Sequence, residues 1–202
     1  MAKAPRIGRA KTRLAKSMGG PEAVRLARLM TQDLIRRMDR DPRWETWLAM
    51  SPSGWTGEGL NLPDGIPVMA QGGGDLGMRM QRVMEGLPPG PVLIVGSDIP
   101  EIAPRHISEG FRALGSHDAV IGAASDGGYW AIGLKRRPRI AKVFEGVRWS
   151  GPHARADTLA NLARQGLSAA LLATLDDVDT EEDLARWRAR QRPASDLRDQ
   201  NR

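Results

Sequence analysis

The segment at residues 91–100 constrains the fold of this chain more than any other stretch. A short apolar run, 92–95, stops at Gly96, and the carboxylate of Asp98 follows two residues later. Short apolar runs bounded in this way are typical of buried strands. In open α/β sheets, ligands bind outside the carboxyl ends of the strands, so an acid at this position points into a crevice instead of the core. We therefore expect Asp98 to belong to a binding site.

Two further apolar runs also end in acidic loops. Asp126 follows the run 119–124, and Asp177 and Asp179 follow the run 171–175. A hard dication such as Mg²⁺ needs only one or two carboxylates when a bound phosphate supplies further oxygens. The three loops together indicate a metal and phosphate site, although each acid alone is equally compatible with a plain turn or a helix cap.

Length and composition predict one soluble α/β domain. The 202 residues suffice for a single core over residues 1–191, followed by a polar, disordered tail at 192–202. The absence of cysteine excludes disulfides and thiolate chemistry. No stretch resembles a membrane span or a signal segment, so we expect a cytoplasmic protein.

Strands alternate with helices along the chain, which predicts a mainly parallel sheet with helices on both faces. The strand at 129–134 is expected to be antiparallel because its preceding turn is short. The predicted strands lie near residues 44–50, 66–70, 92–96, 118–123, 129–134 and 169–175. The predicted helices lie near residues 21–40, 77–87, 104–114, 154–165 and 180–191.

The positive charge of the chain is concentrated near its N-terminus. Residues 1–50 contain 12 Lys and Arg against 5 Asp and Glu, whereas the remainder is nearly balanced. In the loop at 3–14, backbone amides, Lys11 and Arg13 together could hold a polyphosphate. A solvated basic face or a nucleic-acid contact would explain the same charges.

Six motifs, taken together and in this order, resemble a known family. They are KAPRIGRAKTRL (3–14), GDLGMRM (74–80), VGSDIP (95–100), SDGGYW (125–130), VRWS (147–150) and DVDT (177–180). Over about residues 2–190 the chain resembles the bacterial glycosyltransferase A family of the nucleotide-diphospho-sugar transferase superfamily, some members of which are named for arsenosugar biosynthesis. It is more distantly similar to 2-phospho-lactate guanylyltransferase and molybdenum cofactor guanylyltransferase. The resemblance implies a three-layer, Rossmann-like GT-A fold with a mainly parallel mixed sheet.

The resemblance also implies roles for charged residues. Lys11 and Arg13 would bind nucleotide phosphates, and Asp98 would hold Mg²⁺ or Mn²⁺ together with Asp179, for which Asp177 is the substitute. A metal and cationic side chains neutralise the charge that grows on a diphosphate leaving group without any proton transfer.

Further residues of the same motifs are expected to line the nucleotide or the acceptor. Asp126, counted with Lys11, Arg13 and Asp98 as catalytic, would accept hydrogen bonds from hydroxyls. The other expected ligand-binding residues are Gly8, Thr12, Gly74, Asp75, Gly127 and Gly128. Glycine permits close approach of the backbone to a ligand, while Asp75 would equally serve as a helix cap.

One departure concerns the first strand. Family members begin with an apolar strand that leads directly into the phosphate loop, whereas Met1-Ala2-Lys3 leaves no room for such a strand here. We expect the first strand to be missing, and we hypothesise that translation starts upstream. Loss of a central strand would expose neighbouring edges and disturb the nucleotide site.

The leading hypothesis is a metal-dependent transferase that moves a glycosyl group from a sugar nucleotide to a small acceptor. The alternative is a nucleotidyltransferase that joins a nucleoside triphosphate to a phosphorylated acceptor and releases pyrophosphate. An inactive protein, or one that binds nucleic acid, is the third reading, although no recognition motif predicts specific nucleic-acid binding. The sequence does not identify the base, sugar or acceptor, and it leaves a homodimer open.

Overall fold

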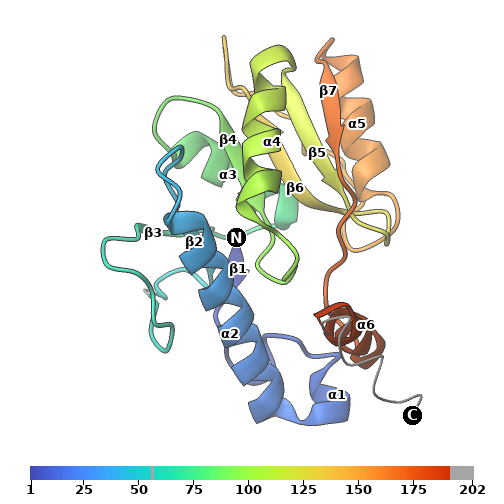
Figure 1. Cartoon of the computed structure of the whole chain (residues 1–202). Helices are drawn as coiled ribbons and strands as arrows, with labels where there is room; N and C mark the ends of the chain where they lie inside the picture. The colour runs from blue at the N-terminus through green and yellow to red at the C-terminus, as the bar shows by residue number, and fades with distance from the viewer. Residues whose placement is uncertain (56, 192–202) are drawn as a thin grey trace, which may run out of the picture.

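The computed structural model describes residues 1–55 and 57–191, and the predicted tail at 192–202 lies outside them. Helices and strands are interspersed through these ranges (Figure 1). In order, they are β1 (Ala2–Lys3), α1 (Ala15–Met18), α2 (Gly20–Asp39), β2 (Leu48–Ser51), β3 (Val68–Ala70), α3 (Leu76–Gly86), β4 (Val92–Val95), α4 (Pro104–Ser116), β5 (Ala119–Ala123), β6 (Tyr129–Leu134), α5 (Ala154–Arg164), β7 (Ala169–Leu172) and α6 (Glu181–Gln191). None of the described helices combines the length and the apolar character of a membrane span.

The larger sheet has the strand order β4-β6-β5-β7 and forms the middle of three layers. As predicted, β6 is antiparallel to both of its neighbours, while β5 and β7 are parallel. Side chains alternate between the two faces of the sheet. In β4, Val92 and Ile94 pack in a core cluster with α3 and α5, whereas Leu93 and Val95 pack in another with α2 and α4. This confirms the predicted α/β/α layering.

A smaller parallel sheet, β1-β2-β3, lies beside α2. The prediction that the first strand is missing is wrong, because β1 is present as two residues, with Ala2 opposite Met50 and Lys3 opposite Ser51 in β2. The ammonium group of Met1 donates a hydrogen bond of 2.7 Å to the carbonyl of Val95 at the end of β4. A single contact of this kind does not form a ladder, so the strands divide into two sheets where we had expected one.

The loop after β1 is anchored against the C-terminal part of the described chain. Leu14, which is fully buried, packs in one cluster with Val178 and with Leu184 of α6. The sequence analysis missed α1, a single turn that directly follows Leu14. In Figure 1, α1, α2 and α6 accordingly lie together below the larger sheet. The basic loop at residues 3–14 and the acidic loop after β7 therefore meet between these helices and the sheet.

Gly122, in the middle of β5, provides a test of the core. A Cβ atom at this position would lie 2.3 Å from Cε2 of Trp130, whose indole N–H donates to the carbonyl of Ala173 at 2.9 Å. We expect Gly122→Ala to lower the free energy of unfolding by about 1–3 kcal/mol in urea denaturation, because the buried ring must move.

The matched control is Gly115→Ala in α4, where no atom lies within 4 Å of the added Cβ. Alanine is the better helix former, so this variant should be at least as stable as the wild type. Equal stabilities of the two variants would contradict the packing described for β5.

Candidate functional site

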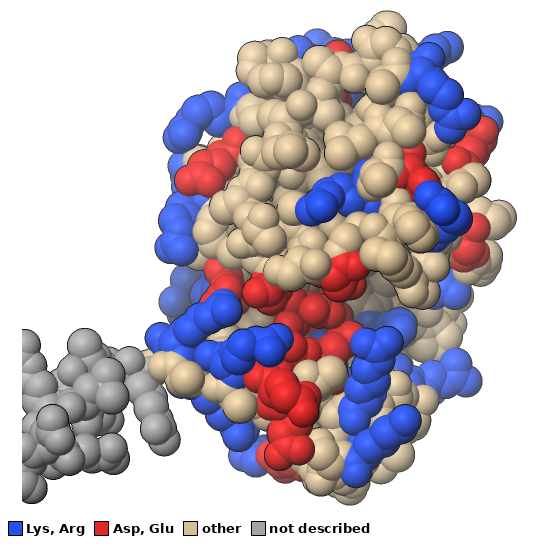
Figure 2. Space-filling view, turned by 90° about the vertical axis from the view of Figure 1, so that its right-hand side faces the viewer, with Lys and Arg blue, Asp and Glu red and all other residues tan. Residues whose placement is uncertain are grey.

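Three acidic loops meet at one edge of the larger sheet because β4, β5 and β7 run in the same direction. Val95 of β4 and Leu172 of β7 lie level across the sheet, because one residue of β6 and one residue of β5 pair in register between them. Asp98, Asp126 and Asp177 each follow the carboxyl end of one of these strands. Figure 2 shows acidic side chains gathered in a band across the middle of the molecule, with Lys and Arg side chains around it.

The centre of the site is a cluster of three carboxylates. Asp98, Asp177 and Asp179 each offer one oxygen atom, and these atoms all lie within 4.8 Å of one another. The backbone N–H of Val178 donates to the carbonyl of Asp98 at 3.1 Å, which joins the two loops. The predicted ligands are Asp98 and Asp179, with Asp177 as a substitute, whereas the structure brings all three together.

Burial and the neighbouring carboxylates together raise the pKa of Asp177 to about 7. Burial is the largest cause, followed by the negative charges of Asp179, Asp98 and Asp126, while Lys11 acts in the opposite direction. Carboxylate oxygens are the donors that Mg²⁺ and Mn²⁺ prefer, and a cation would relieve the repulsion among them. The donor set therefore fits a hard divalent metal.

Lys11 supplies the positive charge nearest to the cluster. Its Nζ lies 2.9 Å from Oδ1 of Asp179 and 3.6 Å from Oδ2 of Asp98, and its side chain is only 6% exposed. The backbone of Lys11 has a φ of +48°, in the left-handed region that few residues adopt. The ammonium group thus lies among the acids, at the border between the expected metal site and the expected phosphate site.

The other expected phosphate ligands lie in the same loop. Gly8, with a φ of +76°, Thr12 and Arg13 are exposed. The carbonyl of Lys11 accepts the N–H of Ala15 at 2.9 Å, so the loop leads directly into α1. Their role as nucleotide ligands stays a prediction.

The turn at residues 126–128 is held by a hydrogen bond within the turn and by packing against another loop of the chain. The N–H of Gly128 donates to Oδ1 of Asp126 at 2.8 Å. A Cβ atom on Gly127, whose φ is +86°, would lie 2.3 Å from the carbonyl oxygen of Pro152. Packing against Pro152 is therefore sufficient to require this glycine, so the expected approach of a ligand is not needed to explain it. Asp126 is exposed and close enough to Asp177 to raise its pKa.

The glycine-rich loop before α3 is held by the predicted cap Asp75 and by Gln71 and Arg82, which were not predicted. Asp75 caps α3 by accepting the N–H of Met78 at 2.8 Å, and Gly74 precedes it with a φ of +93°. The buried amide of Gln71 donates to two carbonyls of β1 and β2, each at 2.9 Å, and Arg82 donates to the carbonyl of Gln71 at 2.6 Å. A polar residue directly after an apolar strand was the available signal for Gln71.

Comparison with solved structures identifies the class of fold. A proposed nucleotide-diphospho-sugar transferase from Desulfovibrio desulfuricans G20 superposes with a TM-score of 0.85 at 29% identity, covering 96% of this chain and 86% of that one. CMP:2-keto-3-deoxy-manno-octonic acid synthetase complexed with CTP gives 0.52 at 14% identity, covering 79% and 86%. Rv0371C from Mycobacterium tuberculosis H37Rv, in complex with manganese, gives 0.54 at 16% identity, covering 92% and 94%. The chain thus has the Rossmann-like fold of the nucleotide-diphospho-sugar transferases.

Sequence comparison places the chain in a family. The chain belongs to DUF2064, described as an uncharacterized protein conserved in bacteria, whose family model matches residues 34–151. The matched region contains Asp98 and Asp126, whereas Lys11, Asp177 and Asp179 lie outside it. No curated protein matches the chain.

Lys11→Met tests the electrostatic account of the cluster. Removal of the ammonium group leaves three carboxylates facing one another, so we expect the free energy of unfolding in metal-free buffer to fall by about 1–3 kcal/mol, between the values for exposed and buried ion pairs. Urea denaturation measures the change.

Lys16→Met in α1 is the matched control, since Lys16 is exposed and the same charge is removed. A loss of stability in the control equal to that of Lys11→Met would show that Lys11 does not neutralise the cluster.

Proposed function

We propose that this chain is a divalent-metal-dependent transferase that binds a sugar nucleotide and transfers the glycosyl group to a small acceptor. The observation that carries the proposal is the meeting of Asp98, Asp177 and Asp179, with oxygen atoms within 4.8 Å of one another, beside the Nζ of Lys11. Mg²⁺ or Mn²⁺ is the cation expected there.

The acidic and basic residues of the site would have different roles. Asp98, Asp177 and Asp179 would hold the metal ion, which supplies positive charge to the phosphate oxygens of the leaving group. Lys11 would give up part of its contact with the acids and neutralise phosphate charge, and Arg13 would bind phosphate oxygens with its planar fork. Asp126, which is exposed, would accept a hydrogen bond from a hydroxyl of the sugar or the acceptor.

The comparisons support a nucleotide-binding transferase in general terms. The structure from Desulfovibrio desulfuricans G20 that matches 96% of this chain is itself proposed to be a nucleotide-diphospho-sugar transferase. A more distant protein of the same fold is complexed with manganese. Both agree with a site that combines carboxylates for a metal with a basic loop for phosphates.

Nucleotidyl transfer is the second candidate. It is favoured by the fold shared with a synthetase complexed with CTP. The same basic loop and acids would serve both reactions, because each reaction expels a phosphorylated leaving group. Release of pyrophosphate from a nucleoside triphosphate would identify nucleotidyl transfer, whereas release of a nucleoside diphosphate from a sugar nucleotide would identify glycosyl transfer.

Thermal unfolding with nucleotides and metals tests the shared part of both candidates. We expect sugar nucleotides or nucleoside triphosphates to raise the melting temperature only when Mg²⁺ or Mn²⁺ is present, because the metal joins the phosphates to the acids. A ligand at 100 times its dissociation constant stabilises the folded state by about 2.7 kcal/mol. Asp98→Asn should abolish the metal-dependent part of the shift.

The control variant is Asp39→Asn, which removes the same charge from an exposed position at the end of α2. It should respond to metal and nucleotide as the wild type does. Equal shifts in the wild type and in Asp98→Asn would exclude Asp98 from the site and contradict the proposed function.

A further inference from the structure

Asp176 directly precedes Asp177 of the carboxylate cluster in sequence but makes different contacts. It is not among the three acids whose oxygen atoms converge. Instead, its Oδ1 accepts a short hydrogen bond from the hydroxyl of Ser125, in the turn that leads to Asp126. Its Oδ2 lies 3.9 Å from Nη2 of Arg190 in the last turn of α6. Asp176 therefore connects the loop after β7 with the loop after β5 and with α6.

Arg190 extends these connections to the third acidic loop. Its Nη1 donates to Oε1 of Glu101 at 2.9 Å, and Glu101 lies three residues after Asp98. One guanidinium group thus lies within ion-pair distance of a carboxylate three residues after Asp98 and of the carboxylate that directly precedes Asp177 in sequence. Together with Ser125, the contacts of Arg190 and Asp176 link all three loops that carry the acids of the site.

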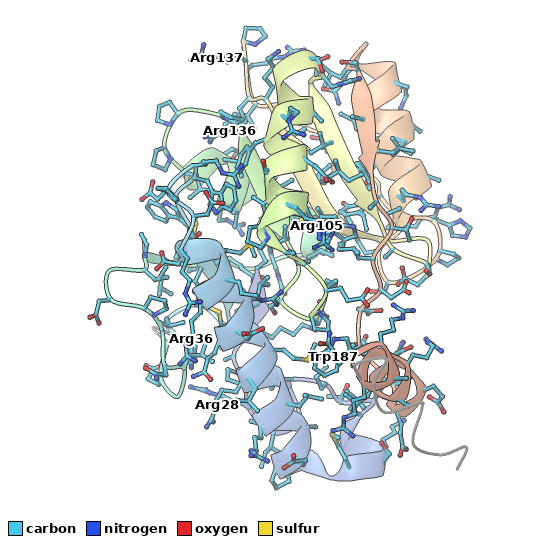
Figure 3. The ribbon with its side chains drawn as sticks, in the orientation of Figure 1. Arg28, Arg36, Arg105, Arg136, Arg137 and Trp187 are labelled. Atoms are coloured by element: carbon cyan, nitrogen blue, oxygen red, sulfur yellow. The ribbon has the colours of Figure 1, made fainter. Side chains whose placement is uncertain are left out.

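The helix that carries Arg190 is itself firmly placed. At its start, the Oδ2 of Asp183 accepts the N–H of Thr180 at 2.8 Å, and the hydroxyl of Thr180 accepts the N–H of Asp183 at 3.2 Å. Leu184 is 2% exposed, and Trp187, labelled in Figure 3, packs with it against α1 and α2. Arg190 therefore extends from a helix whose position is fixed, so its side chain can set the positions of the loops that carry Glu101 and Asp176.

We infer that Arg190, Glu101, Asp176 and Ser125 form a positioning network that sets the spacing of Asp98, Asp177 and Asp179 for the metal. The inference rests on the proposed function, since it assigns the network to that metal site. The residues of the network do not bind the metal. They hold the loops whose carboxylates do, as outer partners of metal ligands commonly do.

A positioning role and a purely electrostatic role predict opposite results at Arg190. Removal of a positive charge near a metal site strengthens the attraction of the remaining acids for a cation. If Arg190 instead fixes the loops, its removal weakens metal binding, because the acids lose their spacing. The side chain of Arg190 is 51% exposed, so its ion pairs contribute little to stability.

The experiment measures the dissociation constant for Mn²⁺ by titration calorimetry on the full chain, and the midpoint of urea denaturation on the same variants. We expect Arg190→Met and Asp176→Ala to weaken Mn²⁺ binding by roughly 10-fold with little change in the midpoint. Arg190→Lys should recover part of the affinity, since it keeps the charge. Combining Arg190→Met with Glu101→Gln should cost no more than Arg190→Met alone, because both changes break the same link.

Two controls separate this inference from the proposed function. Arg188→Met removes the same charge from an exposed position of α6 and should leave Mn²⁺ binding unchanged. Asp98→Asn should abolish binding. If the wild type binds Mn²⁺ and Asp98→Asn does not, but Arg190→Met binds as tightly as the wild type or more tightly, the positioning network is overturned while the metal site stands.

Two other outcomes also contradict the inference. A loss of affinity in Arg190→Met that is matched by a fall in the urea midpoint would make the network merely structural. Failure of the wild type to bind Mn²⁺ at all would contradict the proposed function and, with it, the network. Asp176→Asn, which keeps the acceptor for Ser125 but loses the charge that faces Arg190, provides an intermediate variant if Asp176→Ala fails to fold.

Discussion

Repulsion among three carboxylates, opposed by one ammonium group, is the constraint on which the rest of this structure depends. Asp98, Asp177 and Asp179 come from two loops far apart in the sequence, and burial together with the neighbouring negative charges raises the pKa of Asp177 to about 7. Such an arrangement is costly unless cations compensate for it. The buried Nζ of Lys11 supplies one positive charge, and under the proposed function a divalent metal supplies the rest.

The fold serves to bring these charges together. Strands β4, β5 and β7 run parallel, so their acidic loops share one edge of the sheet, and β1 sends the basic loop towards the same place. Burial of Leu14 against Leu184 and Val178 then fixes the basic loop beside the last acidic loop. The acidic cluster, the basic loop and helix α6 thereby lie together, although the residues involved span most of the described chain.

Much of this organisation could be predicted from the sequence because it depends on local patterns. The apolar runs ending in acids located Asp98 and Asp177, and the short turn before β6 predicted an antiparallel strand. The short β1 and the single turn of α1 could not be predicted, since both depend on tertiary contacts instead of periodicity. The same holds for Gly127, which faces the backbone of Pro152, a residue distant in sequence.

The central claim is that the three carboxylates converge to hold a divalent cation, and the most direct measurement is a crystal structure with Mn²⁺ that uses the anomalous scattering of the metal. The account predicts a single strong anomalous peak within coordination distance of carboxylate oxygens from Asp98, Asp177 and Asp179, with Lys11 displaced from its present contacts. A peak elsewhere on the chain, or no peak at this cluster in crystals saturated with Mn²⁺, would contradict the account.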